Sequence, residues 1–145
     1  MKSHPLSAQG ATVAAAVIAK KKRPLHEIYG ETKLDWDRFK AEARDLMIAR
    51  ASVRGMLSYG ELASQMTTIN LEPHDPKLWA IIGDVAGDEA AANRGLLSVV
   101  VVHKSGDMEP GPGFYELAKY FGRKVGDRTK CFVQEMHLVH AKWSP

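Results

Sequence analysis

The sequence has a single cysteine, Cys131, so no disulfide can form within the chain. Lone free thiols are usual in reducing compartments, and we therefore expect a cytoplasmic protein. No apolar run is long enough for a membrane, because residues 11–19 supply about nine apolar positions where a spanning helix needs about twenty. The basic run Lys20 to Arg23 follows this stretch, whereas a signal peptide carries its basic residues first. We expect no membrane partner.

A strong charge of either sign is also lacking, because 20 Lys and Arg residues against 17 Asp and Glu give a formal net charge of +3. This mild excess is compatible with a polyanionic partner but is far below that of a histone-like protein. Hydrophobic residues at 45% and charged residues at 26% are typical of a globular chain. A chain of 145 residues fits one compact domain that buries roughly two thirds of its unfolded surface.

Motifs of high chemical specificity are missing too, since there is no phosphate-binding glycine loop and no nucleophile elbow. Cys131, His137, His140 and His103 are spaced more widely than the ligands of zinc motifs. We therefore expect no metal and no cofactor.

Residues 1–32 lack a regular hydrophobic pattern and are interrupted by prolines and glycines. We interpret them as a mobile basic leader, with one short helix over residues 12–22. Its basic run is a candidate arm for nucleic acid or a solvated linker. A single globular domain is expected over residues 33–145.

The first helix of this domain is predicted from apolar residues that recur three and four positions apart, namely Leu34, Trp36, Phe39, Ala43, Leu46, Met47 and Met56. Charged residues, among them Arg38, Lys40, Glu42 and Arg44, fill the opposite side. The helix is expected to end near Gly55, because glycine adopts the left-handed C-cap conformation without penalty. A second, short helix is predicted from Tyr59, since Ser58 and Glu61 have the spacing of a capping box.

A third helix is predicted from Asp75 and Pro76, as N-cap and first helical residue, to about residues 93–95. The β-branched run at about 96–102 indicates a strand buried on both faces. A further helix over residues 113–123 follows a glycine- and proline-rich loop, and residues 127–143 favour a helix although their pattern also fits a strand.

This order predicts a small, helix-rich α+β domain of winged helix-turn-helix-like type, although a plain small α+β domain gives the same order. The buried strand would deliver His103 and Lys104 to the surface beside the loop. Gly111 and Gly113 leave backbone amides at the start of the next helix, where an anion is favoured. A simple connector is the alternative interpretation of this loop.

The stretch "SYGELA" at Ser58 to Ala63, followed by "NRGLLSVVVVHKSGD" and a "GPGF" loop, resembles the DNA-binding domain of the O6-alkylguanine-DNA alkyltransferases and their alkyltransferase-like relatives. The resemblance covers about residues 45–122. It implies that Tyr59 contacts a phosphate, that His103 and Lys104 match the His-Arg of the family motif, and that Arg94 is the nearest candidate for its recognition-helix arginine. Base flipping in the family would rely on such residues.

The resemblance departs from the family pattern at one decisive position, because Val102 stands where the reactive cysteine would be. Alkyl transfer through a thiolate is therefore excluded there.

The sequence thus predicts a non-enzymatic nucleic-acid-binding module, with DNA as partner and Tyr59, Arg94, His103, Lys104, Gly111 and Gly113 in contact with it. One alternative is a small hydrolase or nuclease with His103 as general base and a carboxylate such as Glu61 beside it. Another is a protein-interaction domain of a bacterial or phage system. The sequence leaves the oligomeric state open.

Overall fold

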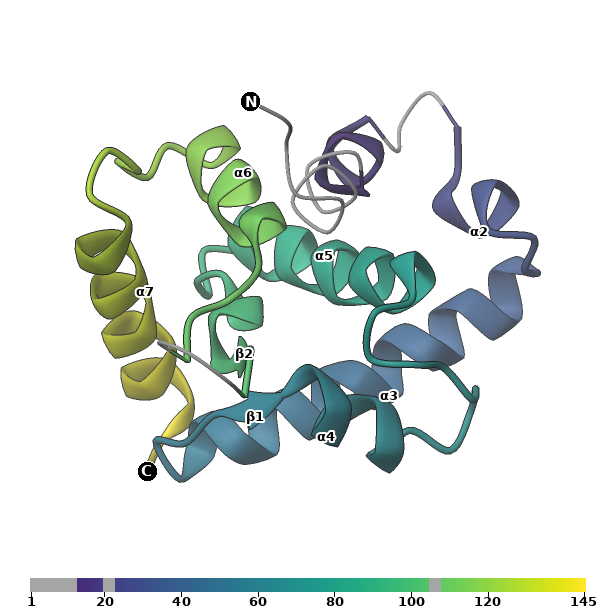
Figure 1. Ribbon diagram of the computed structural model, residues 1–145, viewed down its shortest axis with the longest axis horizontal. Coiled ribbons are helices and arrows are strands. Elements are labelled where there is room, and N and C mark those ends of the chain that lie inside the picture. Colours follow the sequence, from purple (N-terminus) through teal and green to yellow (C-terminus); the bar gives the residue numbers. More distant parts are fainter. Residues whose placement is uncertain (1–12, 20–22, 105–107) are drawn as a thin grey trace.

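The computed structural model describes residues 13–19, 23–104 and 108–145 (Figure 1). Residues 1–12 and 20–22 of the predicted leader and residues 105–107 lie outside the described residues. Its elements follow in chain order: a helix over residues 13–18, α2 (Leu25–Ile28), α3 (Lys33–Ser52), β1 (Leu57–Ser58), α4 (Tyr59–Gln65), α5 (Pro76–Ala91), the 3₁₀ helix η1 (Leu97–Val100), β2 (Val101–Val102), α6 (Pro112–Tyr120) and α7 (Arg128–Trp143).

Helix α3 forms where the apolar stripe predicted a helix, with the Thr32 side chain accepting from the N–H of Asp35 as its N-cap. Two details differ from the prediction. Leu34 is 70% exposed, because it lies two positions before Trp36 and therefore on the opposite side of the helix. The left-handed residue after the helix is Arg54, with φ of 54°, and not Gly55.

Helices α4 and α5 begin at the predicted caps. Ser58 and Glu61 form a complete capping box, and the side chain of Asp75 accepts from the N–H of Lys77 ahead of Pro76. Asn93, with φ of 61°, and Gly95, with φ of 88°, turn the chain after α5 as predicted. Helix α5 lies at the centre of the molecule, packed against α3, η1 and α6, and is buried along most of its length (Figure 1).

The apolar run at 96–102 is fully buried as predicted, but only its last two residues form a strand. Leu97–Val100 instead coil into η1. Helices α3, α5 and α7 all pack against η1, and none of the described strands lies beside it to pair with. Val101–Val102 pair in parallel with Leu57–Ser58, and this is the sheet of the described chain. A strand needs a backbone partner as well as β-branched residues.

The last segment forms the helix α7, so the helical interpretation of residues 127–143 is confirmed and the strand is not. Asp127 caps α7 by accepting from the N–H of Lys130. Glu135 on α7 is 1% exposed, and its carboxylate accepts from the N–H of Leu96 and from both Nε and Nη2 of Arg123. This buried carboxylate ties α7 to the start of η1 and to the chain after α6.

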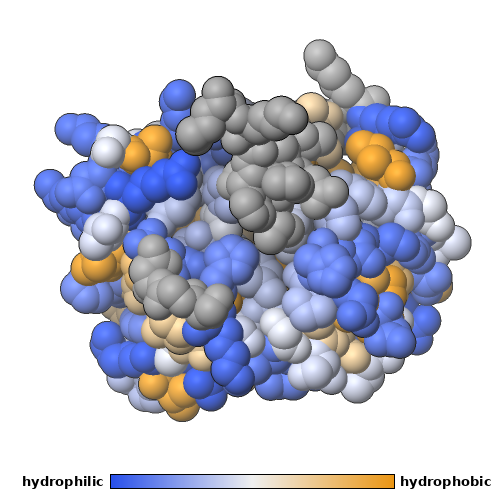
Figure 2. Space-filling view, in the orientation of Figure 1, coloured by the Kyte–Doolittle hydropathy of each residue, from blue (hydrophilic) through white to orange (hydrophobic). Residues whose placement is uncertain are grey.

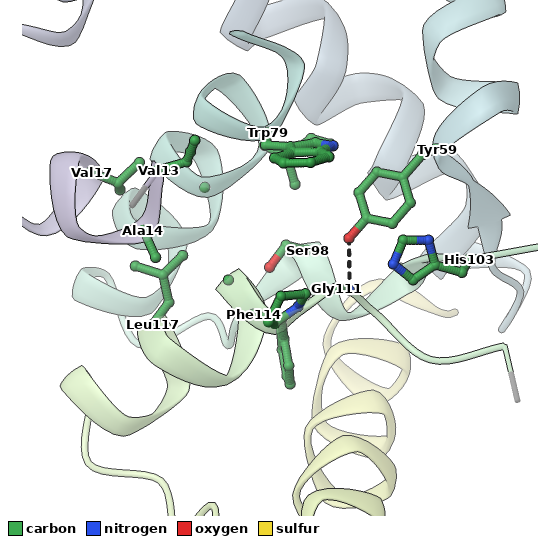
Figure 3. A pocket seen from close by; sticks show the side chains of 14 residues that line it. Val13, Ala14, Val17, Tyr59, Trp79, Ser98, His103, Gly111, Phe114 and Leu117 are labelled. Carbon is green, nitrogen blue, oxygen red and sulfur yellow. Dashed lines mark hydrogen bonds between the residues drawn. The ribbon is translucent and has the colours of Figure 1, made fainter. Parts of the chain in front are cut away.

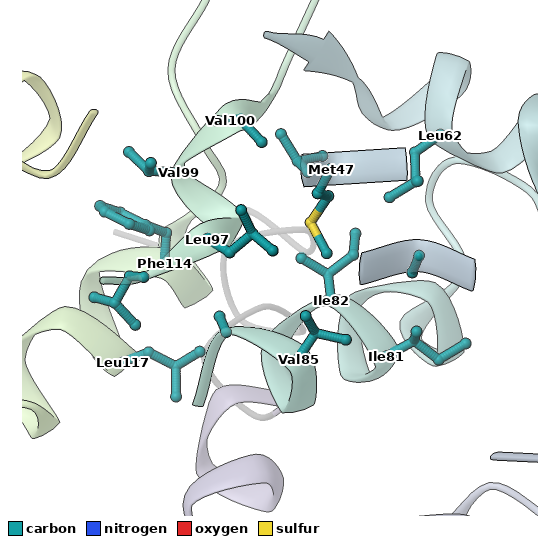
Figure 4. Packing of buried hydrophobic residues seen from close by; sticks show 14 of the residues in the cluster. Met47, Leu62, Ile81, Ile82, Val85, Leu97, Val99, Val100, Phe114 and Leu117 are labelled. Carbon is teal, nitrogen blue, oxygen red and sulfur yellow. The ribbon is translucent and has the colours of Figure 1, made fainter. Parts of the chain in front are cut away.

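The core gathers side chains from α3, α4, α5, η1 and α6, seen together in Figure 4. Val13, Ala14, Val17 and Leu25 belong to the same buried cluster, although the sequence placed them in the leader and started the domain at residue 33. The described part of the leader therefore packs on the domain. The fold is α+β, mostly helical with one two-stranded parallel sheet.

The surface in Figure 2 is mainly hydrophilic, with apolar side chains in separate small patches on the face shown. Over the described ranges, no helix combines the length and the apolar character needed to cross a membrane.

Candidate functional site

The parallel sheet sets the position of two predicted site residues. Ser58 pairs with Val102, and both strands run in the same direction. The next residue of each strand, Tyr59 and His103, therefore leaves the sheet at the same edge. Their rings lie 4.9 Å apart between centroids, tilted by 37°. A short ladder between segments distant in sequence thus creates an aromatic pair.

Gly111 lies directly against the Tyr59 and His103 pair. Its N–H donates to the hydroxyl of Tyr59 at 2.9 Å, and the N–H of His103 donates to the carbonyl of Glu109 at 2.9 Å, which folds the loop back along β2. A Cβ on residue 111 would lie 3.2 Å from the Tyr59 hydroxyl and 3.5 Å from Nε2 of His103. The loop approaches this closely because residue 111 has no side chain.

Tyr59, His103 and Gly111 line one end of a cavity of ≈ 60 Å³ between α5, α6 and the residues 13–18 helix (Figure 3). Its walls are mainly apolar, from Trp79 and Ile82 of α5, Phe114 and Leu117 of α6, and Val13, Ala14 and Val17.

Ser98 supplies a polar group to this cavity. It is 5% exposed, and its Oγ has no hydrogen-bond partner in the part of the chain that the structure describes. Buried hydroxyls without a partner are rare, because each loses its water without compensation. This hydroxyl is a buried polar atom of the cavity with unused hydrogen-bonding capacity.

The titration behaviour of the site follows from burial and from neighbouring charge. Burial raises the pKa of Tyr59 above its usual value, and the hydrogen bond from Gly111 opposes that rise only in part. The phenol therefore stays neutral at physiological pH. Tyr115, which donates to Glu109 at 2.6 Å, also has its pKa raised, by burial and then by that carboxylate. Arg128 lies over the Tyr115 ring at 4.6 Å.

Lys104 follows His103 and is exposed. The pKa of Glu61 is lowered, first by its hydrogen bonds with Ser58 and to a smaller extent by the charges of Lys104 and Arg50. A positively charged side chain therefore lies near the Tyr59 and His103 pair. The carboxylate of Glu61 is engaged at the helix cap, where it accepts from the N–H of Ser58 at 2.7 Å.

Arg94 is not brought to this site. Its Nε and Nη2 each donate to Glu89 at 2.8 Å, and Arg44 of α3 donates to the same carboxylate. Glu89 is 2% exposed, so the arginine neutralises a buried charge. Among the predicted nucleic-acid residues, the structure thus gathers Tyr59, His103, Lys104, Gly111 and Gly113 and places Arg94 elsewhere.

Several acidic and histidine side chains outside this site have structural partners. Trp36 donates to Asp84, and Lys40 pairs with Asp84 and Asp88. His140 bonds to the Gly55 carbonyl through Nε2, and Cys131 is buried. Within the described residues, no group of three or more His, Cys, Asp or Glu side chains is placed to hold a metal ion.

Sequence reasoning missed Trp79, Ser98 and the leader residues as parts of the site. Trp79 of α5 is half-buried against the cavity. A serine inside a run of valines was a signal for Ser98, since a hydroxyl within an apolar segment needs a partner. No pattern in the leader indicated which surface it would cover.

Comparison of the chain with protein-family profiles, with characterised proteins and with solved structures finds no significant match.

Proposed function

We propose that this protein is a non-enzymatic nucleic-acid-binding module of the cytoplasm, with DNA as its partner, and that it binds through a winged-helix-like surface centred on Tyr59 and His103. The observation that carries the proposal is the pairing of these two rings at 4.9 Å beside a cavity, with the close approach of Gly111 behind them.

The chemistry of this surface suits a nucleic acid strand. Aromatic faces stack on bases whatever their sequence, and His103 and Lys104 are both exposed. Lys104 can neutralise a phosphate. Helix α6 begins beside the pair without a side-chain cap at Gly111, so the positive end of the helix dipole adds to the attraction for a phosphate.

The order of the elements supports the winged-helix part of the proposal, because α4 and α5 are followed by β2 and by a loop in the position of a wing. The connection between α4 and α5 spans residues 66–75, longer than the three- or four-residue turn of a standard helix-turn-helix. The proposal therefore rests on the Tyr59 and His103 surface, and it leaves Arg94 out because its guanidinium is bound to Glu89.

The two alternatives receive less support. A hydrolase would need an activated His103, and Glu61 is engaged by Ser58 at the helix cap. A protein-interaction domain would be favoured by a continuous apolar surface, whereas the apolar side chains visible in Figure 2 are separated by hydrophilic ones.

The test is a titration of the full chain into fluorescein-labelled single-stranded and duplex DNA of about 20 nucleotides, followed by anisotropy at rising salt. Binding should weaken steeply with salt, because each neutralised phosphate releases counterions. Lys104→Gln should weaken binding to all sequences and reduce the salt slope by about one. Lys130→Gln, an exposed lysine on α7, is the matched control and should change neither. Binding that is absent, or insensitive to salt, would overturn the proposal.

A further inference from the structure

Ser98 places a hydroxyl in the cavity that bonds to no other described group. The residue is 5% exposed, and its Oγ makes no hydrogen bond within the described ranges. Figure 3 shows this oxygen among the side chains that line the cavity. A buried hydroxyl that has lost its water costs free energy until another partner restores the bond. A molecule bound in the cavity would supply that partner.

Three further groups in the lining can donate a hydrogen bond. The hydroxyl of Tyr59 accepts from Gly111 and keeps its own proton, because burial raises the pKa of this phenol. His103 carries a proton on one ring nitrogen in either tautomer. The N–H of Gly113, at the second position of α6, has no acceptor inside the helix. Together with Ser98, these donors favour a ligand that accepts hydrogen bonds.

The charge at the cavity favours a negative ligand. Helix α6 spans nine residues, and its N-terminus, from Gly111 to Phe114, lies in the cavity wall without a side-chain cap. The positive end of the helix dipole is therefore next to the cavity. None of the described lining residues is Asp or Glu. The nearby carboxylate of Glu61 is held at the start of α4, where Lys104 lies close enough to lower its pKa. A carboxylate group combines the acceptor and the charge that this wall calls for.

The rest of the cavity is apolar. Ile82 and Leu117 line it, and Val13 and Val17 lie on the side opposite Tyr59 (Figure 3). Such walls hold water poorly, since a buried water needs two to four polar partners. The volume of ≈ 60 Å³ lies between the about 15 Å³ that one water needs and the about 150 Å³ that holds benzene. An apolar body of about three carbon atoms fits this space.

We propose that this cavity is a binding site for a short-chain monocarboxylate such as butyrate. The carboxylate accepts from Ser98, from Tyr59 and from the N–H of Gly113, and the alkyl chain lies against Ile82 and Leu117. His103 is exposed and lines the cavity, so the ligand enters beside it. The site stands independently of the nucleic-acid function proposed above.

The test is a titration of sodium butyrate into the isotope-labelled full chain, followed by the amide signals in NMR spectra. Sodium chloride keeps the ionic strength constant. We expect saturable shifts at Gly113 and at the residues around Ser98. Butanol has the chain without the charge, and inorganic phosphate has the charge without the chain, so each should bind about ten-fold more weakly or less.

Three outcomes of these titrations would overturn the proposal. Without a saturable shift by butyrate, the cavity holds water only. Equal affinity for butanol would show that the site does not recognise a carboxylate. Phosphate that shifts the same amides with the affinity of butyrate would make the start of α6 a phosphate subsite of the nucleic-acid surface.

Ser98→Ala tests the polar end of the site. It breaks no hydrogen bond of the described residues, so the thermal transition should not fall. Its affinity for butyrate should drop about ten-fold, because a bond to a charged group is lost. Ser52→Ala, at an exposed position of α3, is the matched control and should bind butyrate like the parent. Equal affinities in the two variants would overturn the proposal.

Leu117→Val tests the apolar end by enlarging it by about one methylene group. The ratio of the affinities for pentanoate and butyrate should rise about four-fold, the value of one buried methylene. Leu138→Val, at a position 58% exposed on α7, is the control and should leave the ratio unchanged. Ile82→Val makes the same test from the other wall if circular dichroism shows Leu117→Val to be unfolded. A ratio that stays at the parent value in the folded variant would overturn the proposal.

Discussion

The hydroxyl of Tyr59 accepts a hydrogen bond from the backbone N–H of Gly111 at 2.9 Å, although 52 residues separate the two in sequence. This bond fastens the loop after β2 to the first residue of α4. It holds the aromatic pair, the cavity and the start of α6 in one arrangement, and it can be removed by taking away a single oxygen atom.

Tyr59→Phe should therefore lower the free energy of unfolding by about 1 to 3 kcal/mol, because it leaves the buried N–H of Gly111 without an acceptor. Urea denaturation followed by circular dichroism measures the change. Tyr120→Phe removes the same oxygen from a ring that is 59% exposed and should have no measurable effect. Equal losses of stability in Tyr59→Phe and Tyr120→Phe would show that the Tyr59 hydroxyl does not stabilise the fold through its hydrogen bond with Gly111.

Gly111→Ala should disturb the site by contact and not by backbone strain, since φ at residue 111 is −68° and suits any residue. The new methyl group would lie 3.2 Å from the Tyr59 hydroxyl and should push that ring away from the loop. We expect a destabilisation of about 1 kcal/mol and weaker DNA binding. Gly126→Ala, where no atom lies within 4 Å of the added Cβ, is the control for both measurements.

Glu42 of α3 gives the protein a defined sensitivity to acid. Burial raises the pKa of its carboxyl, but hydrogen bonds from Thr67 and Thr68, of 2.6 to 2.9 Å, outweigh burial and lower the pKa to about 2. The folded-state pKa thus lies below the unfolded one of 4.5. The stabilisation is complete above about pH 4.5 and is lost as the pH falls toward 2.

Glu42→Gln should lower stability at pH 6 by about 1 kcal/mol, a small amount because water screens this partly exposed site. It should also flatten the fall in stability between pH 5 and pH 3, measured by urea denaturation at each pH. Asp45→Asn, at an exposed position of the same helix, is the control and should leave the slope of the parent unchanged. If the fall in stability between pH 5 and pH 3 were as steep in Glu42→Gln as in the parent, Glu42 would not be the source of the acid sensitivity.

Glu135→Ala should cost about 3 to 5 kcal/mol, because it leaves the Arg123 guanidinium and the N–H of Leu96 without their acceptor in a largely buried place. Adding Arg123→Met should restore part of the loss by removing the unpaired charge. A double-mutant cycle measured by thermal or urea unfolding gives the coupling. Purely additive losses would show that the ion pair contributes no coupling of its own.

Local chemistry predicted much of the fold. The capping box of Ser58 and Glu61 and the pair Asp75 and Pro76 depend on neighbours within three residues, and both helices begin where these signals stand. The strand at 96–102 was predicted over too many residues, because a run of β-branched residues is typical of any buried segment and not only of a strand that pairs with a neighbour. Only Val101 and Val102 find a strand beside them.

The site was predicted in part. Tyr59, His103 and Gly111 were named from the sequence and do meet, but their meeting depends on the register of a two-residue ladder that no local pattern indicates. Arg94 was expected at the site because it is the nearest candidate for the recognition-helix arginine that the family resemblance implies. Its pairing with Glu89 depends on burial of that carboxylate, a property of the packed molecule. The packing of residues 13–19 is likewise a tertiary effect.

The parallel ladder between β1 and β2 has a consequence for folding order. Its partners, Ser58 and Val102, are 44 residues apart, and everything between them must be arranged before they can meet. Closing a loop of that length costs conformational entropy, whereas a helix forms between residues close in sequence and needs no such closure. The ladder should therefore form late on the folding path. The surface made by Tyr59 and His103 would then appear only as the native core closes, and a chain that had made its helices but not its ladder would have no site at all.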